Sequence, residues 1–558
     1  MALDFKMAAD AVYFVPLGGC GVFGANMSLY GYQGQWIMVD CGMGFADDTM
    51  PGVDILLPAI DFAQKLGDDL LAIILTHGHE DHIGAIGHHW PKLRKPIYAT
   101  KFTAELVRQK GVEHHWDNQV RLHEVSMQAH LDIGPFGIDF IRMAHSIPES
   151  NALAIEARGL GMFLHTGDWK IDPEPMEGDM TDGEALQRLG DRGVIAMMCD
   201  STNAMVPGHS PSEKTVREGL RELLGEFDKG IVLTCFASNV TRYRSIYEAA
   251  AANGRQMCIV GKSMLKIDDA ARKTGYLKGI PPFLTRDTVG SIPTSKLVYV
   301  CTGSQGETRA AMAKIANKEH PLVKMAPEDV AIFSSRDIPG NTPAIERMRN
   351  KLIAAGIHVI THHDAPVHAS GHPYRDELKQ IYRWVRPHIA IPVHGEAMQM
   401  EKNAVLAKEC GIEKTLVPVN GNVIRISRDK AEMVGAVTSG MLAIEGNRVV
   451  AIDHEAILTR KRIMFNGSAV VTVVMDGHGA LLADPKVTAL GLLDENSELD
   501  IKYLQDAVRE IKNVIRNMSK EQRGDDAVVS EAVRVAARRF FNERFDRKPQ
   551  TRVHLVRI

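Results

Sequence analysis

The feature that most constrains this chain is a packet of metal-binding side chains, Thr76-His77-Gly78-His79-Glu80-Asp81-His82. Imidazoles and carboxylates gathered in a folded protein lose their hydration at a high cost in free energy, unless a cation binds between them. The packet contains no cysteine, so its histidine and carboxylate groups suit Zn²⁺ in an open site better than in a closed structural site. A solvated polar loop is the alternative interpretation, which the clustering of ligand types disfavours.

The residues around the packet predict that it lies in a loop at the end of a buried strand. Residues 70–75 form a short, continuous apolar run that is typical of such a strand. Gly78 permits a tight turn within the packet, and we expect a helix to begin near Ile83. The fold therefore presents the packet at the edge of a sheet.

Further candidate ligands follow strand-like runs elsewhere in the chain. His145, Asp168 and His394 each come directly after an apolar-rich run. Open sheets tend to place functional groups at the carboxyl ends of their strands. Each residue alone could merely form a cap or a local hydrogen bond, but their common position favours one shared site.

The whole pattern resembles the metallo-β-lactamase superfamily, whose signature is His-x-His-x-Asp-His followed by a distant His, a bridging Asp and a final His. The resemblance implies two divalent metal ions, with Zn²⁺ expected first and Mn²⁺ or Mg²⁺ as alternatives. One ion is held by three histidines, the other by an aspartate and two histidines, and a further aspartate bridges them. In that order, the implied ligands are His77, His79 and His145; Asp81, His82 and His394; and Asp168.

Two further residues lie close to these motifs in the sequence. Asp40 matches the superfamily's first motif, in which an aspartate orients the metal-ligand loop without itself binding metal. His165 comes shortly before Asp168, and we assign it to packing or hydrogen bonding.

The interval between Asp168 and His394 is too long for a loop inside a compact domain, so it must contain a folded insertion. Strand-like runs at residues 231–234, 297–301 and 330–333 alternate with helical segments. Strands that alternate with helices predict a largely parallel sheet covered by helices.

This arrangement resembles the β-CASP branch of the superfamily, whose members are nucleases with a second α/β domain inserted before the last metal ligand. Asp200, His372 and His394 fit three motifs of that branch. Within the branch, the sequence is most similar to the bacterial ribonuclease J family. The supporting segments are residues 76–85, 145–149, 166–170, 236–239, 302–307, 338–341 and 368–372.

The predicted fold class is α/β: a metallo-β-lactamase αββα sandwich, an inserted β-CASP α/β domain and a small α+β C-terminal domain. The expected boundaries are 1–208 for the first part of the sandwich, 209–367 for the insertion, 368–447 for the second part of the sandwich, 448–462 for a linker and 463–558 for the C-terminal domain.

The resemblance implies a ribonuclease that hydrolyses RNA phosphodiesters with two metal ions. The ions lower the pKa of a shared water and screen the charge of the scissile phosphate. Family likeness implies 5′-to-3′ exonuclease action that favours 5′-monophosphate ends, and endonuclease cleavage where RNA threads without inserting its end. The expected roles are RNA maturation and mRNA decay.

Three residues are expected to take part in catalysis. His372 is the candidate partner of the leaving 3′ oxygen, and Asp81 is a catalytic residue as well as a ligand. Asp200 either pairs with His372 or stabilises the metal-site loop, and the sequence does not separate these roles.

Small polar residues of the insertion and of the following loop are implied to bind the terminal phosphate of RNA. They are His368, Ser370, Ser238 and Asn239. A turn or a helix cap is the alternative role for Ser238 and Asn239. The chain departs from the family pattern at Val22, where an acidic residue is usual, and at Thr241, where histidine is frequent.

The charge of the chain is compatible with binding to a nucleic-acid backbone only through a local basic stripe. The formal net charge is -4 and the pI is about 6.6, whereas backbone binding needs local positive charge. The candidates for the stripe are Lys92, Arg94, Lys95, Arg242, Arg244 and Lys262, with ordinary surface charge as the alternative.

Single-stranded RNA is the expected partner, and the C-terminal domain is expected to mediate a homodimer or homotetramer, as in ribonuclease J relatives. RNA-decay proteins are further candidate partners. No apolar run approaches the ~20 residues that span a bilayer, and the N-terminus lacks the pattern of a signal peptide. Seven cysteines without a Cys-x-x-Cys pair suggest a reducing compartment, so we expect a cytoplasmic protein without membrane contact.

Other functions are open at this point. A small-molecule hydrolase on the same scaffold is disfavoured by the large insertion. A DNA-directed β-CASP nuclease is a nearer rival, because the same metal chemistry attacks either phosphodiester and the sequence does not show whether a 2′-hydroxyl is read. A non-catalytic RNA-binding scaffold would have no need of the complete ligand set.

Overall fold

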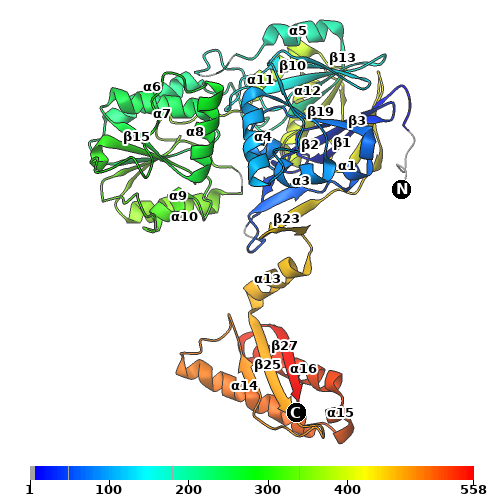
Figure 1. Ribbon diagram of the computed structural model, residues 1–558, viewed down its shortest axis with the longest axis vertical. Coiled ribbons are helices and arrows are strands. Elements are labelled where there is room, and N and C mark those ends of the chain that lie inside the picture. Colours follow the sequence, from blue (N-terminus) through cyan, green and yellow to red (C-terminus); the bar gives the residue numbers. More distant parts are fainter. Residues whose placement is uncertain (1–6, 48, 177, 179, 339) are drawn as a thin grey trace. The chain divides into compact units, whose positions relative to one another are not determined.

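The computed structural model describes residues 7–47, 49–176, 178, 180–338 and 340–558 (Figure 1). Parts of the expected N-terminal segment and of the motif at 338–341 lie outside these described residues. The chain divides into two compact units, one made of residues up to 45 with 56–441 and the other of 46–55 with 442–558. Each unit is described by itself.

The first unit contains a sandwich of two sheets. The strands of the first sheet lie in the order β22, β21, β1, β2, β3, β6, β7, β8. Their bounds are β22 (Ala431–Ala436), β21 (Asn422–Ile426), β1 (Val12–Gly18), β2 (Met27–Tyr32), β3 (Gln35–Val39), β6 (Leu70–Ile74), β7 (Ile97–Thr100) and β8 (Leu122–Val125). The central strands β1, β2 and β6 are almost wholly buried, as their apolar sequences predict.

The strands of the second sheet lie in the order β20, β19, β13, β12, β11, β10, β9. Their bounds are β20 (Lys414–Thr415), β19 (Ile389–Val393), β13 (Val194–Asp200), β12 (Gly161–His165), β11 (Asn151–Ala157), β10 (Phe136–Arg142) and β9 (His130–Ile133). Strand β19 follows the insertion in sequence, yet it pairs in parallel with β13. The chain therefore completes the same sheet after a long excursion.

The sandwich is held together by apolar side chains from the facing surfaces of the two sheets. Phe14 and Ile74 from the first sheet pack with Phe136, Phe163 and Ile391 from the second. Full burial of such a side chain stabilises the fold by roughly 1.5–3 kcal/mol. This core fixes both sheets, and with them the strand ends at one edge.

Helices cover the outer faces of both sheets, which confirms the predicted αββα architecture (Figure 1). The helices on the second sheet are α5 (Gly183–Arg192), α11 (Arg375–Val385) and α12 (Ala397–Glu409). Those on the first are α1 (Asp61–Lys65), α3 (Ile86–Leu93) and α4 (Lys101–Glu113).

The insertion folds around a parallel sheet, as the alternation of strands and helices predicts. Its strands lie in the order β15 (Gln256–Val260), β16 (Leu297–Cys301), β14 (Ile231–Thr234), β17 (Val330–Phe333), β18 (His358–Ile360). The flanking helices are α6 (Glu213–Gly225), α7 (Val240–Ala252), α8 (Lys262–Thr274), α9 (Ala311–Ala316) and α10 (Thr342–Ala354). The three strand ranges expected from the sequence coincide with β14, β16 and β17.

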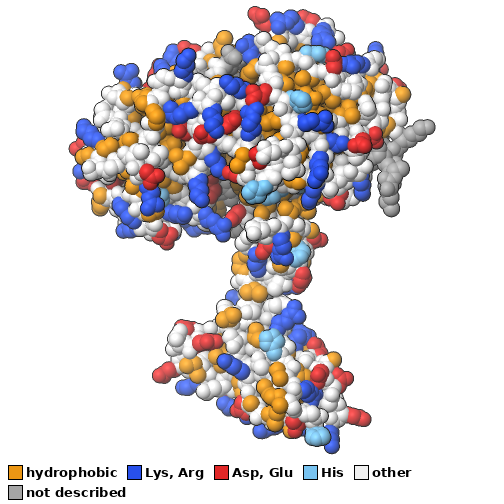
Figure 2. Space-filling view, viewed as in Figure 1, with side chains coloured by type: hydrophobic (Ala, Val, Ile, Leu, Met, Phe, Trp, Pro, Cys, Tyr) orange, Lys and Arg blue, Asp and Glu red, His pale blue; other side chains and the backbone are white. Residues whose placement is uncertain are grey.

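Helices α4 of the sandwich and α8 of the insertion lie side by side through polar contacts (Figure 1). Lys273 lies 3.0 Å from Glu105, and Gln109 Nε2 donates to Asp269 Oδ2 at 3.1 Å. Figure 2 shows side chains of both charge signs interspersed on the surface in this region. The contact between the two folded parts is thus exposed and charged on this side.

The second unit contains a small α+β fold, also as predicted. Strand β25 (Ser468–Met475) alternates half-buried and buried residues and pairs with β26 (Lys486–Thr488) and β27 (Gln550–Arg557). Helices α14 (Glu498–Asn517) and α16 (Asp526–Phe545) pack on one face, with Val471, Ile511 and Phe541 in the core. The shorter elements of the chain are β4 (Gly44–Phe45), β5 (Ile55–Pro58), β23 (Met441–Glu445), β24 (Arg448–Ala451), α13 (Glu455–Asn466) and α15 (Lys520–Gly524).

The segment 448–462, where we expect a linker, contains β24 and the first part of α13. In the described part of the chain, every helix is too short or too polar for a membrane span.

Candidate metal centre and adjoining groove

The predicted metal-binding packet begins in the loop after β6, at the carboxyl end of a central strand, and ends within α2 (Glu80–Ile83), which contains Asp81 and His82. The backbone at Gly78 does not adopt the left-handed conformation that favours glycine, so the predicted turn is not the reason for this residue. A Cβ atom at Gly78 would instead lie 2.7 Å from Leu106 Cδ1 of α4. Glycine suits this position because α4 packs closely against the loop, and a larger residue would require the Leu106 side chain to shift.

Three histidine nitrogens converge at one point beside this loop. His79 Nδ1 lies 3.1 Å from His77 Nε2 and 2.9 Å from His145 Nε2. The second ring nitrogens of two of these residues are engaged elsewhere: His77 Nδ1 lies 3.0 Å from Thr76 Oγ1, and His145 Nδ1 lies 2.5 Å from the Gly371 carbonyl oxygen. These contacts aim the remaining nitrogens of His77 and His145 at a common centre.

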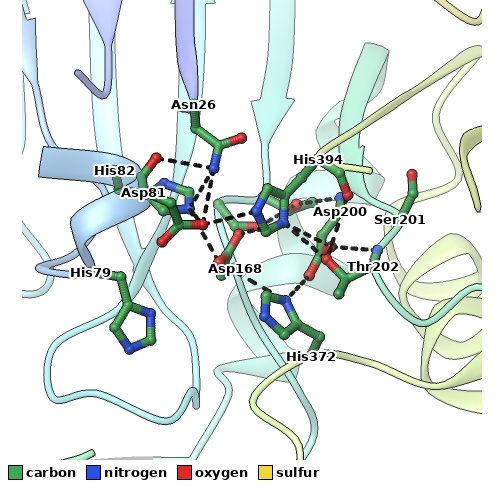
Figure 3. Close-up of polar contacts among 12 residues, drawn as sticks. Asn26, His79, Asp81, His82, Asp168, Asp200, Ser201, Thr202, His372 and His394 are labelled. Carbon is green, nitrogen blue, oxygen red and sulfur yellow. Dashed lines mark hydrogen bonds and ion pairs between the residues drawn. The ribbon is translucent and has the colours of Figure 1, made fainter. Parts of the chain in front are cut away.

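A second group lies on the other side of Asp168 (Figure 3). His82 Nε2 is 3.1 Å from Asp168 Oδ2, and His394 Nε2 is 3.2 Å from Asp81 Oδ2. Ligand atoms of Asp81, His82, Asp168 and His394 all lie within 4.8 Å of one another, as do those of His77, His79, His145 and Asp168. The structure thus brings together all seven residues predicted as ligands, with Asp168 common to both groups.

The first group suits a divalent cation because its imidazoles are held neutral. Burial is the main reason that the pKa of His77 and of His145 lies well below its ordinary value, and neighbouring histidines lower it further. Burial likewise lowers the pKa of His79 to about 4. Neutral nitrogens that face one another carry lone pairs without a proton to share, which is the arrangement that a bound metal ion satisfies.

The second group has the opposite electrostatic character. Burial disfavours the charged forms of His82 and His394, but the carboxylate of Asp168, with help from Asp81, raises the pKa of both well above its ordinary value. Asp168 Oδ1 is buried and makes no hydrogen bond, although His394 Nδ1 lies 3.2 Å away. A buried carboxylate oxygen without a hydrogen-bond donor fits a cation ligand, so the donor set of this group also suits a divalent ion.

Asp40 lies beneath the ligand loop, where the resemblance implies an orienting aspartate. Its carboxylate accepts hydrogen bonds from the Thr76 backbone N–H at 2.8 Å and from Thr76 Oγ1 at 2.9 Å, and it lies 2.7 Å from His82 Nδ1. The contact leaves His82 Nε2 directed at Asp168. His165, predicted to have no ligand role, lies 2.8 Å from the Tyr30 hydroxyl through Nδ1.

Asp200 is in contact with His372, the pairing that the sequence offered as one of its two roles, and also with His394. Its Oδ2 lies 2.9 Å from His372 Nδ1, and its Oδ1 lies 3.2 Å from His394 Nδ1. Burial disfavours a charged His372, but Asp200 and Asp168 outweigh it and raise the pKa of His372. His372 and Asp200 also form a third group of potential ligands with Asp168 and His394, so His372 lies directly beside the predicted metal ligands.

Sequence reasoning missed two polar residues of the centre. The Asn26 side-chain amide lies 3.0 Å from His82 Nε2 and 3.3 Å from Asp81 Oδ2, and Thr202 Oγ1 lies 3.0 Å from His394 Nδ1 (Figure 3). Thr202 could have been found through its place two residues after Asp200. Asn26 follows the glycine-rich loop at residues 18–24, where no residue pattern singles it out.

A shallow groove adjoins the centre beside His145; the empty space at the groove, counted together with the open solvent at its mouth, is about 500 Å³. Asn239 and Ser370, two of the residues predicted to bind phosphate, line this groove together with Thr241. Thr241 is one of the departures from the family pattern. Among the described residues, the groove wall does not include Ser238 or His368. The structure therefore brings two of the four predicted residues together here.

Asn239 also plays the alternative role considered from the sequence. Its Oδ1 accepts a hydrogen bond from the Arg242 backbone N–H at 2.9 Å and so caps the start of α7. The amide nitrogen is not needed for this cap. Ser370 Oγ accepts hydrogen bonds from Asn203 Nδ2 at 2.9 Å and from the His372 backbone N–H at 3.1 Å.

Arg242 does not belong to a basic surface stripe, contrary to the expectation from the sequence. It is fully buried and forms a bidentate pair with Glu213 at 2.6 and 2.9 Å. Its NH1 donates to the carbonyl oxygens of Ser334 and Val367, both at 3.0 Å. Arg242 thus fixes the backbone just before residues 368–372.

Successive stretches of the chain match known families. The metallo-β-lactamase superfamily matches residues 20–183, and the β-CASP domain of ribonuclease J matches residues 228–352. A family described as a Zn-dependent metallo-hydrolase RNA specificity domain matches residues 356–418, and the ribonuclease J C-terminal domain matches residues 455–558.

Full-length relatives and a solved structure extend these matches. Ribonuclease J of Sinorhizobium meliloti is 41% identical over 99% of this chain and 98% of its own length. Ribonuclease J of Thermus thermophilus is 33% identical over 91% of this chain and 90% of its own. A protein of unknown function from Enterococcus faecalis V583 shares the fold, with a TM-score of 0.51 and 15% identity, over 75% of this chain and all of that one.

Proposed function

The chain belongs to the ribonuclease J family, and we propose that it degrades RNA from 5′ ends with two divalent metal ions held around Asp168. It is a metal-dependent nuclease, and thus a hydrolase, that binds RNA. The observation that carries the proposal is the convergence of the predicted ligands on Asp168 from widely separated strand ends.

The proposed ligand roles follow the two groups described above. His77, His79 and His145 hold one ion, and Asp81, His82 and His394 hold the other. Asp168 lies between them, and Asp40 orients the loop. Zn²⁺ is the proposed ion because nitrogen and carboxylate ligands suit it, with Mn²⁺ or Mg²⁺ as the alternatives.

The side chains of this centre prepare the hydrolysis of a phosphodiester. Bound divalent ions would supply positive charge that acidifies water and screens the scissile phosphate. Asp200 holds His372 at Nδ1 and leaves its Nε2 to interact with the leaving 3′ oxygen. Asp81, which contacts His394, completes the proposed set of catalytic residues.

The preference for 5′-monophosphate ends is proposed to come from the groove beside His145. Asn239 and Ser370 line it, and Ser238 and His368 lie close to them in sequence. A phosphate held there places the first linkage of the RNA at the metal centre and favours 5′-to-3′ exonuclease action. Endonuclease cleavage follows when RNA passes through the groove without inserting its end.

The remaining proposals concern the biological setting and the division of the chain. We place the protein in the cytoplasm, in RNA maturation and mRNA decay, as a homodimer or homotetramer formed through the C-terminal domain, and with RNA-decay proteins as further partners. The proposed boundaries remain 1–208, 209–367, 368–447, 448–462 and 463–558.

An assay with end-defined substrates tests the function. Metal-loaded protein is incubated with RNA and with DNA of the same sequence, each carrying a 5′-monophosphate, triphosphate or hydroxyl end, and the products are followed over time. We expect faster cleavage of RNA than of DNA and release of nucleotides from monophosphorylated RNA first. Equal or faster cleavage of DNA would overturn the RNA assignment in favour of a DNA-directed nuclease.

The double variant Asp81→Ala with His82→Ala is the control for this assay. It should lose turnover while keeping the fold, since both side chains lie at the surface of the metal centre rather than in the apolar core. A fold retained without activity would exclude contamination by another nuclease, and undiminished activity would contradict the ligand assignment.

A further inference from the structure

The groove wall at Ser370 continues into an unassigned cationic side chain, Arg336. Asn203 connects the two residues. Its Nδ2 donates to Ser370 Oγ at 2.9 Å, and its Oδ1 accepts from Arg336 NH1 at 3.4 Å. The Arg336 guanidinium is therefore separated from Ser370 by a single side chain.

The charge of Arg336 is not neutralised by a carboxylate. Within the residues that the structure describes, no Asp or Glu lies at ion-pair distance from its guanidinium, and the side chain belongs to an exposed residue. Nearby arginines differ: Arg349 forms a bidentate pair with Asp337 at 2.9 and 2.7 Å, and Arg242 pairs with Glu213. An exposed guanidinium with free donors is a good phosphate ligand, because its planar fork matches two phosphate oxygens.

The backbone that carries Arg336 is held in place. Gln305 Nε2 donates to the Arg336 carbonyl oxygen at 2.9 Å, and Gln305 Oε1 accepts from the Ile338 backbone N–H at 2.9 Å. One amide side chain thus ties down both ends of this turn after β17. A fixed backbone lowers the entropy that the arginine must lose when it binds an anion.

Two histidines, His362 and His368, lie near Arg336. The centroid of the His362 ring is 6.2 Å from that of His368 and 4.0 Å from that of His363, whose ring is tilted by 39° from it. His362 Nδ1 is buried, and no partner for it is found among the described residues. Arg336 lies within electrostatic range of both rings and contributes to lowering the pKa of His362 and of His368, after burial and nearer cations.

We infer that Arg336 forms a second phosphate-binding position, one step beyond the pocket at Ser370. The inference rests on the proposed function, in which the 5′-phosphate occupies that pocket. The phosphate that follows it outward belongs either to a 5′-triphosphate end or to the linkage with an upstream nucleotide. In both cases the site binds the same chemical group, and it lets RNA without a simple monophosphate end lie in the groove.

Binding measurements with three RNA analogues test this site. All share one sequence with hydrolysis-resistant phosphorothioates at the first linkages: one ends in a 5′-monophosphate, one in a 5′-triphosphate, and one is extended upstream by three nucleotides and ends in a hydroxyl. Binding to the metal-loaded protein is followed by fluorescence anisotropy, and gels verify that the RNA stays intact.

For Arg336→Ala we expect binding of the triphosphate RNA, of the extended RNA, or of both to weaken about tenfold, the effect of losing one charged hydrogen-bond pair. Binding of the monophosphate RNA should stay within about twofold, because its phosphate does not reach Arg336. A loss confined to the triphosphate RNA assigns the site to terminal phosphates, and a loss confined to the extended RNA assigns it to the upstream backbone. Arg336→Lys should recover part of the affinity, since it keeps the charge but not the fork.

Arg221→Ala is the matched control. Arg221 is an exposed arginine on α6 of the same insertion, eight residues after Glu213. It should leave all three affinities unchanged. Equal losses on all three RNAs after Arg336→Ala, or no loss on any, would overturn the inference. Failure of the wild-type protein to prefer monophosphate over hydroxyl ends in a separate titration of unextended RNA would instead contradict the pocket at Ser370.

Discussion

The metal centre and the groove wall beside it lie next to each other but are held in different ways. The proposed ligands of the centre stand near the ends of buried strands, in the loop after β6 or in the short helix α2, and the core between the two sheets fixes those strands. The wall includes Ser370 in the loop after β18 and Asn239 at the start of α7, and it is held by single side chains such as Asn203 and Arg242. The centre is therefore preorganised by the fold, whereas the wall depends on a few individual hydrogen bonds.

This difference separates the expected effects of mutations. Removing a ligand should leave the fold intact, because the sheets support the site, and should eliminate the chemistry. Removing a side chain that holds the wall, such as Arg242, should displace residues that are proposed to contact RNA. It should therefore weaken RNA binding and lower the stability of the fold. The four variants below test this contrast, beginning with the largest effect.

Asp168→Ala should have the largest effect, since Asp168 belongs to both ligand groups. We expect turnover to fall by about 10⁴-fold or more, as for removal of a central catalytic group, and bound metal measured by mass spectrometry to fall with it. Among the metal-free proteins, the variant should stay folded with a lower thermal unfolding temperature, since buried His82 and His394 lose the carboxylate that they face. Asp68→Ala, an exposed carboxylate, is the control. Turnover and metal content near wild type in the Asp168 variant would contradict the shared role of this residue.

His372→Ala tests whether the residue next to the ligands acts on the substrate or on the metal. We expect a loss of about 10²- to 10⁴-fold in turnover, the usual contribution of a general acid or base, with the metal content preserved. The alternative is that His372 binds metal, because it lies close to Asp168 and Asp200. Release of one metal equivalent would show that His372 is a ligand and that the boundary between centre and wall lies elsewhere.

Arg242→Met addresses the wall. The variant leaves Glu213 buried without its partner, which costs about 3–5 kcal/mol in unfolding free energy. Because Arg242 also holds the Val367 carbonyl oxygen, KM for monophosphorylated RNA should rise more than kcat falls. Chemical denaturation and steady-state kinetics measure both effects. Adding Glu213→Gln should restore part of the stability but not KM, and a pure loss of kcat would contradict the assignment of Arg242 to the wall.

His89→Met sharpens the comparison by isolating a buried histidine outside both regions. Burial lowers the pKa of His89 to about 3 against a smaller opposing effect of the Pro58 backbone, and neither ring nitrogen makes a well-aligned hydrogen bond within the described residues. In the unfolded chain His89 is therefore protonated below a pH of about 6.5, whereas in the folded chain it stays neutral down to about pH 3. Stability consequently falls as the pH is lowered toward 3. Between pH 7 and pH 5 the wild type should lose roughly 2 kcal/mol through this residue.

The His89→Met variant should lack that part of the pH dependence when unfolding is measured at both pH values. An identical pH dependence in the two proteins would assign the acid sensitivity to other groups, such as the histidines of the metal centre.

The residues that the structure brings together in the candidate metal centre could be singled out from the sequence, because their types are rare in combination and stand directly after apolar runs. His77, Asp168 and His394 are recognisable in this way without knowledge of the fold. Asn26 was not, since asparagine occurs in many turns and only the packing of the loop at residues 18–24 brings its amide to His82.

The wall was predicted less well, because the same residue types serve several structural purposes there. From the sequence, Arg242 was a candidate for a basic surface stripe, and only the fold shows that it is buried against Glu213. Asn239 reads equally as a phosphate ligand and as a helix cap, and its two polar atoms permit both. Gly78 shows the same limit, since its glycine is explained by the proximity of Leu106 and not by its own conformation.

The polar contact between α4 and α8 has a consequence for the environment of the protein. Ions such as potassium and chloride gather around exposed charges and weaken their attraction, so the pairing of Lys273 with Glu105 loses strength as the electrolyte concentration rises. An apolar seam would be insensitive to the same change. The strength of the contact between α4 and α8 therefore depends on the ionic strength inside the cell.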